Sequence, residues 1–218
     1  MRAGDSRRCE ADSNLDLSLL RPWRGLDTGG ASVGVVSEEM KDGSSRWKTF
    51  GERVIYDNPW VWLGQVDVEL PDGERFWHHV VRLHRAAMMV LVDEQDRALL
   101  LWRHRFVQDK WGWELPGGLI DEDEEPAETA VRELEEETGY RAGTVEHLVT
   151  FQPLVGMVDS EHVVFVGREP EKTGEPTEVN EVERMEWVPL AQVPELIAAG
   201  TIWNSGTLVA LMGLLTLR

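Results

Sequence analysis

The chain has 218 residues, of which 42% are hydrophobic and 28% are charged, so it can bury a core and is not disordered as a whole. Forty acidic residues against 22 Lys and Arg give a formal net charge of −18, which argues against nucleic acid or an anionic membrane as a general partner. The only cysteine, Cys9, cannot form an internal disulfide, and no apolar run approaches the roughly 20 residues that span a bilayer. We therefore expect a cytoplasmic protein that binds neither membranes nor nucleic acid.

The first part of the chain divides into two segments of different texture. Residues 1–47 are rich in Gly, Ser and charged residues and show no sustained hydrophobic period, which predicts a flexible N-terminal tail. Residues 48–85 contain short alternating runs of the β type, with turn residues at 71–74. We predict an antiparallel β meander here, with strands at Arg53–Tyr56, Trp60–Leu70 and Arg75–Leu83.

In the remaining segment, residues 86–218, strand patterns and helical patterns alternate. The predicted strands are Ala87–Val92, Ala98–Arg103, Val145–Phe151, His162–Val166 and Arg184–Val188. Helical periodicity occurs over Pro126–Thr138, Gln192–Ala199 and Ser205–Leu215. Strands interleaved with helices indicate a layered α/β or α+β structure.

The most acidic part of the chain lies between Gly118 and Tyr140, where ten carboxylates accompany one basic residue, Arg132. Pro126 suits the first turn of a helix, and Gly139 suits the left-handed residue that ends one. These two signals predict a helix from Pro126 to Thr138. Arg132 is placed to pair with a carboxylate of the preceding loop, and Glu124 is the candidate.

Two faces of this helix carry different expectations. Ala127, Val131, Leu134 and Thr138 recur at helical spacing and predict the face that packs on a sheet. Glu133, Glu136 and Glu137 stand at i, i+3 and i+4, so we expect their carboxylates to converge on another face. Hard divalent cations would relieve the repulsion among them, because Mg²⁺ and Mn²⁺ prefer oxygen ligands. The alternative for such a cluster is an ordinary solvated acidic face.

The complete spacing favours the metal site over the solvated face. Gly118 is followed after five residues by Glu124, after seven more by Arg132-Glu133-Leu134, and then by Glu136-Glu137 and Gly139-Tyr140. This pattern matches the signature of the Nudix hydrolases at every position, and the chain resembles that family over about residues 86–218. The resemblance implies an α+β fold, an α/β/α sandwich around a mixed sheet, preceded by the small β meander. It also implies hydrolysis of a nucleoside diphosphate linked to another moiety.

The resemblance assigns roles to the signature residues. Glu133, Glu136 and Glu137 would hold Mg²⁺ or Mn²⁺, with the backbone carbonyl of Gly117 as a further ligand. Glu124 and Arg132 would form the ion pair that fixes loop to helix, and Gly118 and Gly139 complete the signature. Candidates for the general base are Glu136 and two glutamates of a later loop, with Glu181 favoured over Glu178.

The surrounding sequence is similar to the ADP-ribose pyrophosphatase branch of the family. The similarity includes Trp113–Gly118 and the basic residues Arg103–Arg105, and it implies that residues 48–85 form a homodimer contact. Four residues become candidates for substrate binding: Arg105, Glu114, Gly156 and Glu161. For Arg105 the alternative is a surface ion pair. The chain departs from the branch at Val155-Gly156, where Pro-Gly is usual.

ADP-ribose, giving AMP and ribose 5-phosphate, is therefore the first substrate to expect, with nucleotide sugars as the nearest alternative. Coenzyme A, dinucleoside polyphosphates and oxidised nucleoside triphosphates are other substrates of the family. A non-catalytic, ligand-sensing regulator is the alternative of another class. Such regulators tend to lose signature carboxylates and to carry a DNA-binding module, whereas this sequence keeps every carboxylate and offers no basic helix-turn-helix.

Overall fold

The computed structural model describes residues 45–177 and 182–217, which form eleven strands, two α-helices of twelve or more residues, a short α-helix and a 3₁₀ turn. Most of the segment predicted as a flexible tail, residues 1–44, lies outside the described residues. No helix in the described part of the chain is both long and apolar enough to span a membrane.

The predicted β meander is present as the strands β1 (Lys48–Asp57), β2 (Val61–Glu69) and β3 (Arg75–Leu83), which pair in antiparallel fashion in that order. A two-residue strand, β9 (Val158–Asp159), adds to β3 in parallel. β1 is exposed along its whole length, although four of its ten residues are large and hydrophobic. The β meander therefore presents to solvent an outer strand with several exposed hydrophobic side chains.

Two further sheets build the core. One has the order β7-β4-β10-β8 and the other the order β11-β5-β6. β4 pairs with β10 in parallel and with β7 in antiparallel fashion, so the first sheet is mixed. The bounds are β4 (Ala86–Leu91), β5 (Arg97–Arg105), β6 (Lys110–Glu114), β7 (Gly117–Leu119), β8 (Tyr140–Phe151), β10 (His162–Lys172) and β11 (Arg184–Pro189).

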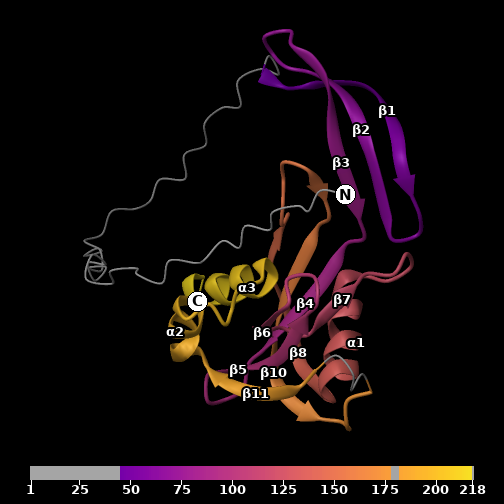
Figure 1. Cartoon of the computed structure of the whole chain (residues 1–218). Coiled ribbons are helices and arrows are strands. Elements are labelled where there is room, and N and C mark those ends of the chain that lie inside the picture. The colour runs from indigo at the N-terminus through magenta and orange to yellow at the C-terminus, as the bar shows by residue number, and fades with distance from the viewer. Residues whose placement is uncertain (1–44, 178–181, 218) are drawn as a thin grey trace, which may run out of the picture. The chain divides into compact units, whose positions relative to one another are not determined.

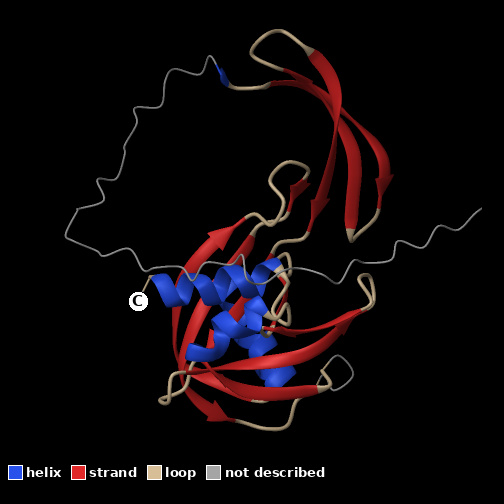
Figure 2. Cartoon of the chain, turned by 60° about the vertical axis from the view of Figure 1, so that its left-hand side comes forward, coloured by secondary structure: helices blue, strands red, loops and turns tan. Residues whose placement is uncertain are grey.

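Helices cover the mixed sheet on both faces (Figure 1). Because side chains alternate along a strand, Ala87, Met89 and Leu91 of β4 pack with α1 (Pro126–Thr138), whereas Val90 packs with α3 (Ser205–Thr216). The short helix α2 (Val193–Ala198) follows the 3₁₀ turn Leu190–Gln192 and contributes to the α3 side. Figure 2 shows the helices against the strands of the core. The fold is the expected α+β sandwich with a mixed sheet.

The helix α1 has the bounds that the sequence predicts. Glu125 and Glu128 form a capping box at its start, followed by Pro126 at the first helical position. Gly139 ends it in the left-handed region with φ of 68°, and a Cβ there would lie 2.2 Å from the carbonyl oxygen of Gly174. Both ends of the helix are therefore fixed by local chemistry.

The face of α1 that packs on the sheet is only partly the predicted one. Leu134 and Thr138 are buried as expected, but Ala127 and Val131 are only partly buried. Ala130 and Glu137 are buried instead. They lie four residues before and three residues after Leu134, so they share its side of the helix, which faces the sheet. As a result, Glu137 does not share a solvent-facing surface with Glu133 and Glu136.

Candidate functional site

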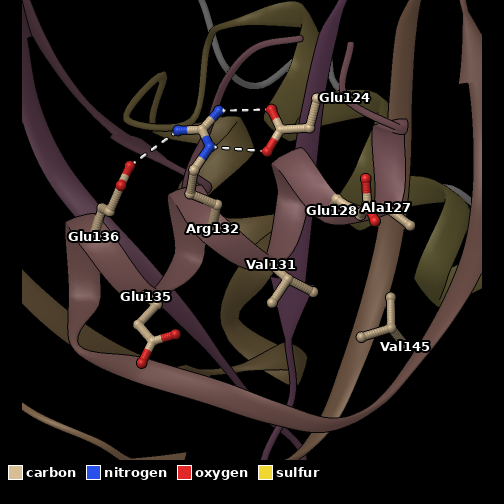
Figure 3. Close-up of a pocket in the computed structure, with 8 residues that line it drawn as sticks. All are labelled: Glu124, Ala127, Glu128, Val131, Arg132, Glu135, Glu136 and Val145. Atoms are coloured by element: carbon tan, nitrogen blue, oxygen red, sulfur yellow. Dashed lines mark hydrogen bonds and ion pairs between the residues drawn. The ribbon is translucent and has the colours of Figure 1, made fainter. Parts of the chain in front are cut away.

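The loop that precedes α1 is tied to the helix by an ion pair between Glu124 and Arg132. Nε of Arg132 lies 3.0 Å from Oε1 of Glu124, and Nη2 lies 3.0 Å from Oε2, so the contact is bidentate (Figure 3). The hydroxyl of Thr129 donates a further hydrogen bond of 2.7 Å to Glu124. This is the pair that the sequence predicts, and it lines a hollow of about 740 Å³ beside the helix.

We expect Glu124→Gln to destabilise the protein in a pH-dependent manner. Hydrogen bonds from Arg132 and Thr129 lower the pKa of Glu124 to about 2 from its ordinary value near 4.5. The ionised carboxylate therefore stabilises the fold above pH 4.5, and this contribution is lost as the pH falls through about 2. Because Arg132 is one third exposed, we expect a loss of about 1–2 kcal/mol in the free energy of unfolding at pH 7.

Urea unfolding at pH 7 and pH 2 measures this effect, and the difference between variant and wild type should vanish at the lower pH. Glu122→Gln, in the exposed part of the same loop, is the matched control and should change the free energy of unfolding by less than about 0.5 kcal/mol. Equal destabilisation by Glu124→Gln at both pH values would contradict a charge-based role for the pair.

Glu133 and Glu136 meet at the same guanidinium. Nη1 of Arg132 lies 2.7 Å from Oε1 of Glu133 and 2.9 Å from Oε2 of Glu136. The carboxylate of Glu133 also lies against Gly118, since a Cβ at that glycine would lie 2.3 Å from Oε1. Gly118 is therefore the residue whose lack of a side chain leaves room for Glu133.

Glu137 takes part in the same site from the buried side of α1. Its Oε2 accepts a hydrogen bond of 3.0 Å from the backbone N–H of Gly117, and its Oε1 forms an ion pair with Arg103. Both side chains of this pair are only 3% exposed. Burial raises the pKa of Glu137 to about 7, although the nearby charge of Arg103 lowers it.

The four predicted metal ligands are thus neighbours along one chain of contacts, which runs from Glu136 through Arg132 to Glu133, Gly118, Gly117 and Glu137. Three carboxylates and a backbone carbonyl are the oxygen donors that Mg²⁺ and Mn²⁺ prefer, so the residues present fit the implied ion. In the present arrangement of residues 45–177 and 182–217, however, no three Asp, Glu, His or Cys side chains are placed so that they could hold a metal ion together. Arg132 and Arg103 engage the three carboxylates, and a divalent cation would have to take their place.

A cleft of about 680 Å³ opens beside Gly117 and Gly118. Its walls include the arginines at the end of β5, Glu114 of β6 and the first residues of α3. Nε of Arg105 lies 3.0 Å from Oε1 of Glu114, and Nη2 lies 2.5 Å from Oε2. The structure thus brings two of the predicted substrate-binding residues together in one cleft, and it pairs them with each other.

The other predicted site residues lie elsewhere or outside the described part. Glu161 pairs with Arg85 at 2.5 Å, and the carbonyl oxygen of Gly156 lies 2.8 Å from Nε2 of His78 on the β meander. Neither Glu161 nor Gly156 lines the cleft. The two candidate loop bases, Glu178 and Glu181, lie outside the described residues.

From the sequence, Arg103 is expected only as part of a basic patch, and its pairing with Glu137 is not predicted. The alternation of side chains along β5 could have predicted this pairing. Leu99, Leu101 and Arg103 lie on the same side of β5, and Leu99 belongs to the core that packs on α1. An arginine that continues this buried row needs a carboxylate on α1. Residues 203–207, which lead into α3 and form its first turn, are a second part of the cleft that the sequence does not indicate.

Comparisons with known proteins give the family and the fold of the chain. A model of the NUDIX domain matches residues 82–208. The chain is 49% identical over 172 residues to CMP-5'-(N-acetyl-N-hydroxy-3-aminopropyl)phosphonate hydrolase of Streptomyces rubellomurinus, which covers 79% of this chain and 84% of the relative. It is 30% identical to ADP-ribose pyrophosphatase of Bacillus subtilis, over 75% of this chain and 90% of the relative.

A solved structure of an ADP compounds hydrolase has the same fold. Its TM-score is 0.68 at 19% identity, with 78% of this chain and 92% of that chain covered. The family model covers more than half of the chain, and the acidic helix that it includes carries the complete spacing of glycines, glutamates and arginine. The chain belongs to the Nudix family.

Proposed function

We propose that this protein hydrolyses the phosphoanhydride bond between a nucleoside 5'-phosphate and a second phosphorus that carries a small polar group, and that it needs Mg²⁺ or Mn²⁺. Water adds to one phosphorus and the bridging oxygen leaves with the other, so the products are a nucleoside monophosphate and a phosphate or phosphonate. The observation that carries the proposal is the joining of Glu133, Glu136 and Glu137 to Gly117 and Gly118 at the edge of a cleft with arginines in its wall.

The chain's own residues have distinct parts in this reaction. The signature carboxylates and the carbonyl of Gly117 would hold the divalent cation, which when bound polarises the phosphoryl group and activates water. Arg105 binds non-bridging phosphate oxygens through its planar guanidinium, and Glu114 orients that guanidinium. Glu181, or else Glu178 or Glu136, accepts a proton from the attacking water.

Three kinds of substrate satisfy this description. ADP-ribose, split into AMP and ribose 5-phosphate, is the substrate that the sequence around the signature favours. A CMP-linked phosphonate is the second. It is supported by the 49% identity to the Streptomyces hydrolase, which is higher than the identity of about 30% to an ADP-ribose pyrophosphatase. Nucleotide sugars, which contain the same phosphoanhydride bond, are the third.

A substrate panel with Mg²⁺ and with Mn²⁺ tests the proposal. Release of AMP from ADP-ribose, or of CMP from a CMP-linked phosphonate, is the expected result, and chelation of the metal should abolish it. Comparison of kcat/KM across ADP-ribose, CMP-linked phosphonates, nucleotide sugars, coenzyme A and oxidised nucleoside triphosphates identifies the substrate. If no compound with a phosphoanhydride is cleaved, the protein is not this hydrolase and a ligand-sensing role is favoured.

We further propose that the β meander contacts a second copy of the chain. Val54, Ile55 and Tyr56 of β1 are each more than half exposed, and an apolar edge strand of this kind favours pairing with another chain. Light scattering should give a mass of about 50 kDa, twice the 24.8 kDa of one chain, and Ile55→Asp should shift it toward the monomer. A wild-type mass of one chain at micromolar concentration would contradict this.

A further inference from the structure

Arg103 is the most deeply buried charged residue of the cleft wall. It lies near the end of β5, is 2% exposed, and forms an ion pair with Glu137, which is 3% exposed. When Glu137 is ionised the pair as a whole is neutral, which is the condition under which two charges are tolerated away from water. Each of the two charges is therefore stabilised by the other as long as no further ion binds beside them.

The pair cannot remain unchanged when a divalent cation binds. Glu137 is one of the carboxylates that would hold the ion, and a guanidinium on the same carboxylate repels that ion. Once the carboxylate of Glu137 binds the cation, the buried guanidinium of Arg103 has lost its counter-ion. A buried charge without a partner is costly, so a new anion becomes favourable at that point.

The hydrogen bonding of Arg103 indicates the same need. Nη2 is engaged in the ion pair with Glu137, but the buried Nε makes no hydrogen bond within residues 45–177 and 182–217. A guanidinium offers five donors in a planar fork that matches phosphate oxygens. Arg103 lines the same cleft as Arg105, two residues along the same side of β5.

We propose that Arg103 couples metal binding to substrate binding: it neutralises Glu137 while no metal is bound, and it turns to a phosphate oxygen of the substrate when a divalent cation takes that carboxylate. The inference rests on the proposed function, because it presumes a substrate with a diphosphate. It assigns to one arginine two alternating partners, one on α1 and one in the cleft.

If Arg103 couples the two binding steps, the variant Arg103→Gln should bind Mg²⁺ more tightly and a diphosphate analogue more weakly. Calorimetry at pH 9, where proton competition for the carboxylates is small, measures binding of Mg²⁺ alone and then of methylenediphosphonate at saturating Mg²⁺. We expect Mg²⁺ to bind about tenfold more tightly to the variant, because a competing cation is gone, and methylenediphosphonate to bind about tenfold more weakly. A merely structural arginine would weaken both or neither.

Two further variants complete the experiment. Arg103→Lys keeps the charge without the planar fork, so we expect wild-type Mg²⁺ binding and an intermediate affinity for methylenediphosphonate. Arg97→Gln, on the same strand but paired with Asp93 outside the cleft, is the matched control and should alter neither affinity. Circular dichroism and thermal unfolding check that each variant folds.

The inference is overturned if Arg103→Gln changes the two affinities in the same direction or not at all, or if both Arg103 variants fail to fold. These outcomes differ from a failure of the proposed function. If the wild type binds Mg²⁺ and methylenediphosphonate but cleaves none of the anhydrides, the proposed function is wrong while the coupling remains. If the wild type cleaves an anhydride and Arg103→Gln binds both ligands as the wild type does, the coupling alone is wrong.

Discussion

Glu137→Gln should reduce kcat for the best anhydride by a factor of about 10² to 10⁴ and leave the protein folded. The variant removes one negative charge from the group that would hold the divalent cation, and such an ion contributes several kcal/mol to stabilisation of the transition state. The amide can still accept the hydrogen bond from the N–H of Gly117. Steady-state kinetics at saturating Mg²⁺ measures the loss.

The stability of the same variant should depend on pH. Burial raises the pKa of Glu137 to about 7 in the folded chain from an ordinary value of 4.5, so the metal-free wild type loses stability as the pH rises from 4.5 through about 7. Glu137→Gln removes this pH dependence because its amide stays neutral, but it also leaves the buried charge of Arg103 without its counter-ion. In chelator the free energy of unfolding of the variant should therefore change less between pH 5 and pH 8 than that of the wild type.

Glu135→Gln is the matched control, because Glu135 lies on the same helix and pairs with Arg141 at the surface. It should keep kcat within about twofold of the wild-type value. A Glu137→Gln enzyme with nearly normal turnover would contradict the assignment of Glu137 as a metal ligand.

Gly118→Ala should lower kcat by about a hundredfold without unfolding the protein. The added methyl group would lie 2.3 Å from Oε1 of Glu133, so this carboxylate must move away. The end of a glutamate side chain can swing at little cost, and the fold is therefore preserved. A shift of about 1 Å in a residue that positions the reaction costs about a hundredfold in rate.

Kinetics and thermal unfolding separate the two effects. Gly51→Ala provides the control, since a Cβ at Gly51 meets nothing within 4 Å, and it should change neither kcat nor the melting temperature appreciably. If Gly118→Ala retains full activity, Glu133 does not need its present position and its role as a ligand is wrong.

The helix α1 and its partner Glu124 could be predicted from the sequence because their determinants are local. Pro126 starts the helix and Gly139 ends it in the left-handed region, and both positions lie within one or two residues of the boundary that they set. Arg132 follows Glu124 by eight residues, a short loop and two helical turns, so their pairing needs no knowledge of the rest of the chain.

The position of Glu137 could not be predicted in the same way. Helical spacing places it near Glu133 and Glu136, but which side of the helix faces the sheet depends on contacts with β4 and β10, far away in sequence. Its partner Arg103 precedes it by 34 residues on another sheet. The sequence therefore predicts which carboxylates form the candidate site, but it does not predict that Arg103 pairs with Glu137.

Metal titration of the hydrolysis reaction shows whether cleavage depends on a divalent cation at the signature carboxylates. Wild-type protein is stripped with chelator and given ADP-ribose or a CMP-linked phosphonate, and nucleoside monophosphate release is followed as Mg²⁺ is added back. We expect no release in chelator and a saturable, metal-dependent rate that Glu137→Gln lowers by at least about a hundredfold. Release at the same rate in chelator, or none from any phosphoanhydride at millimolar Mg²⁺, would contradict this expectation.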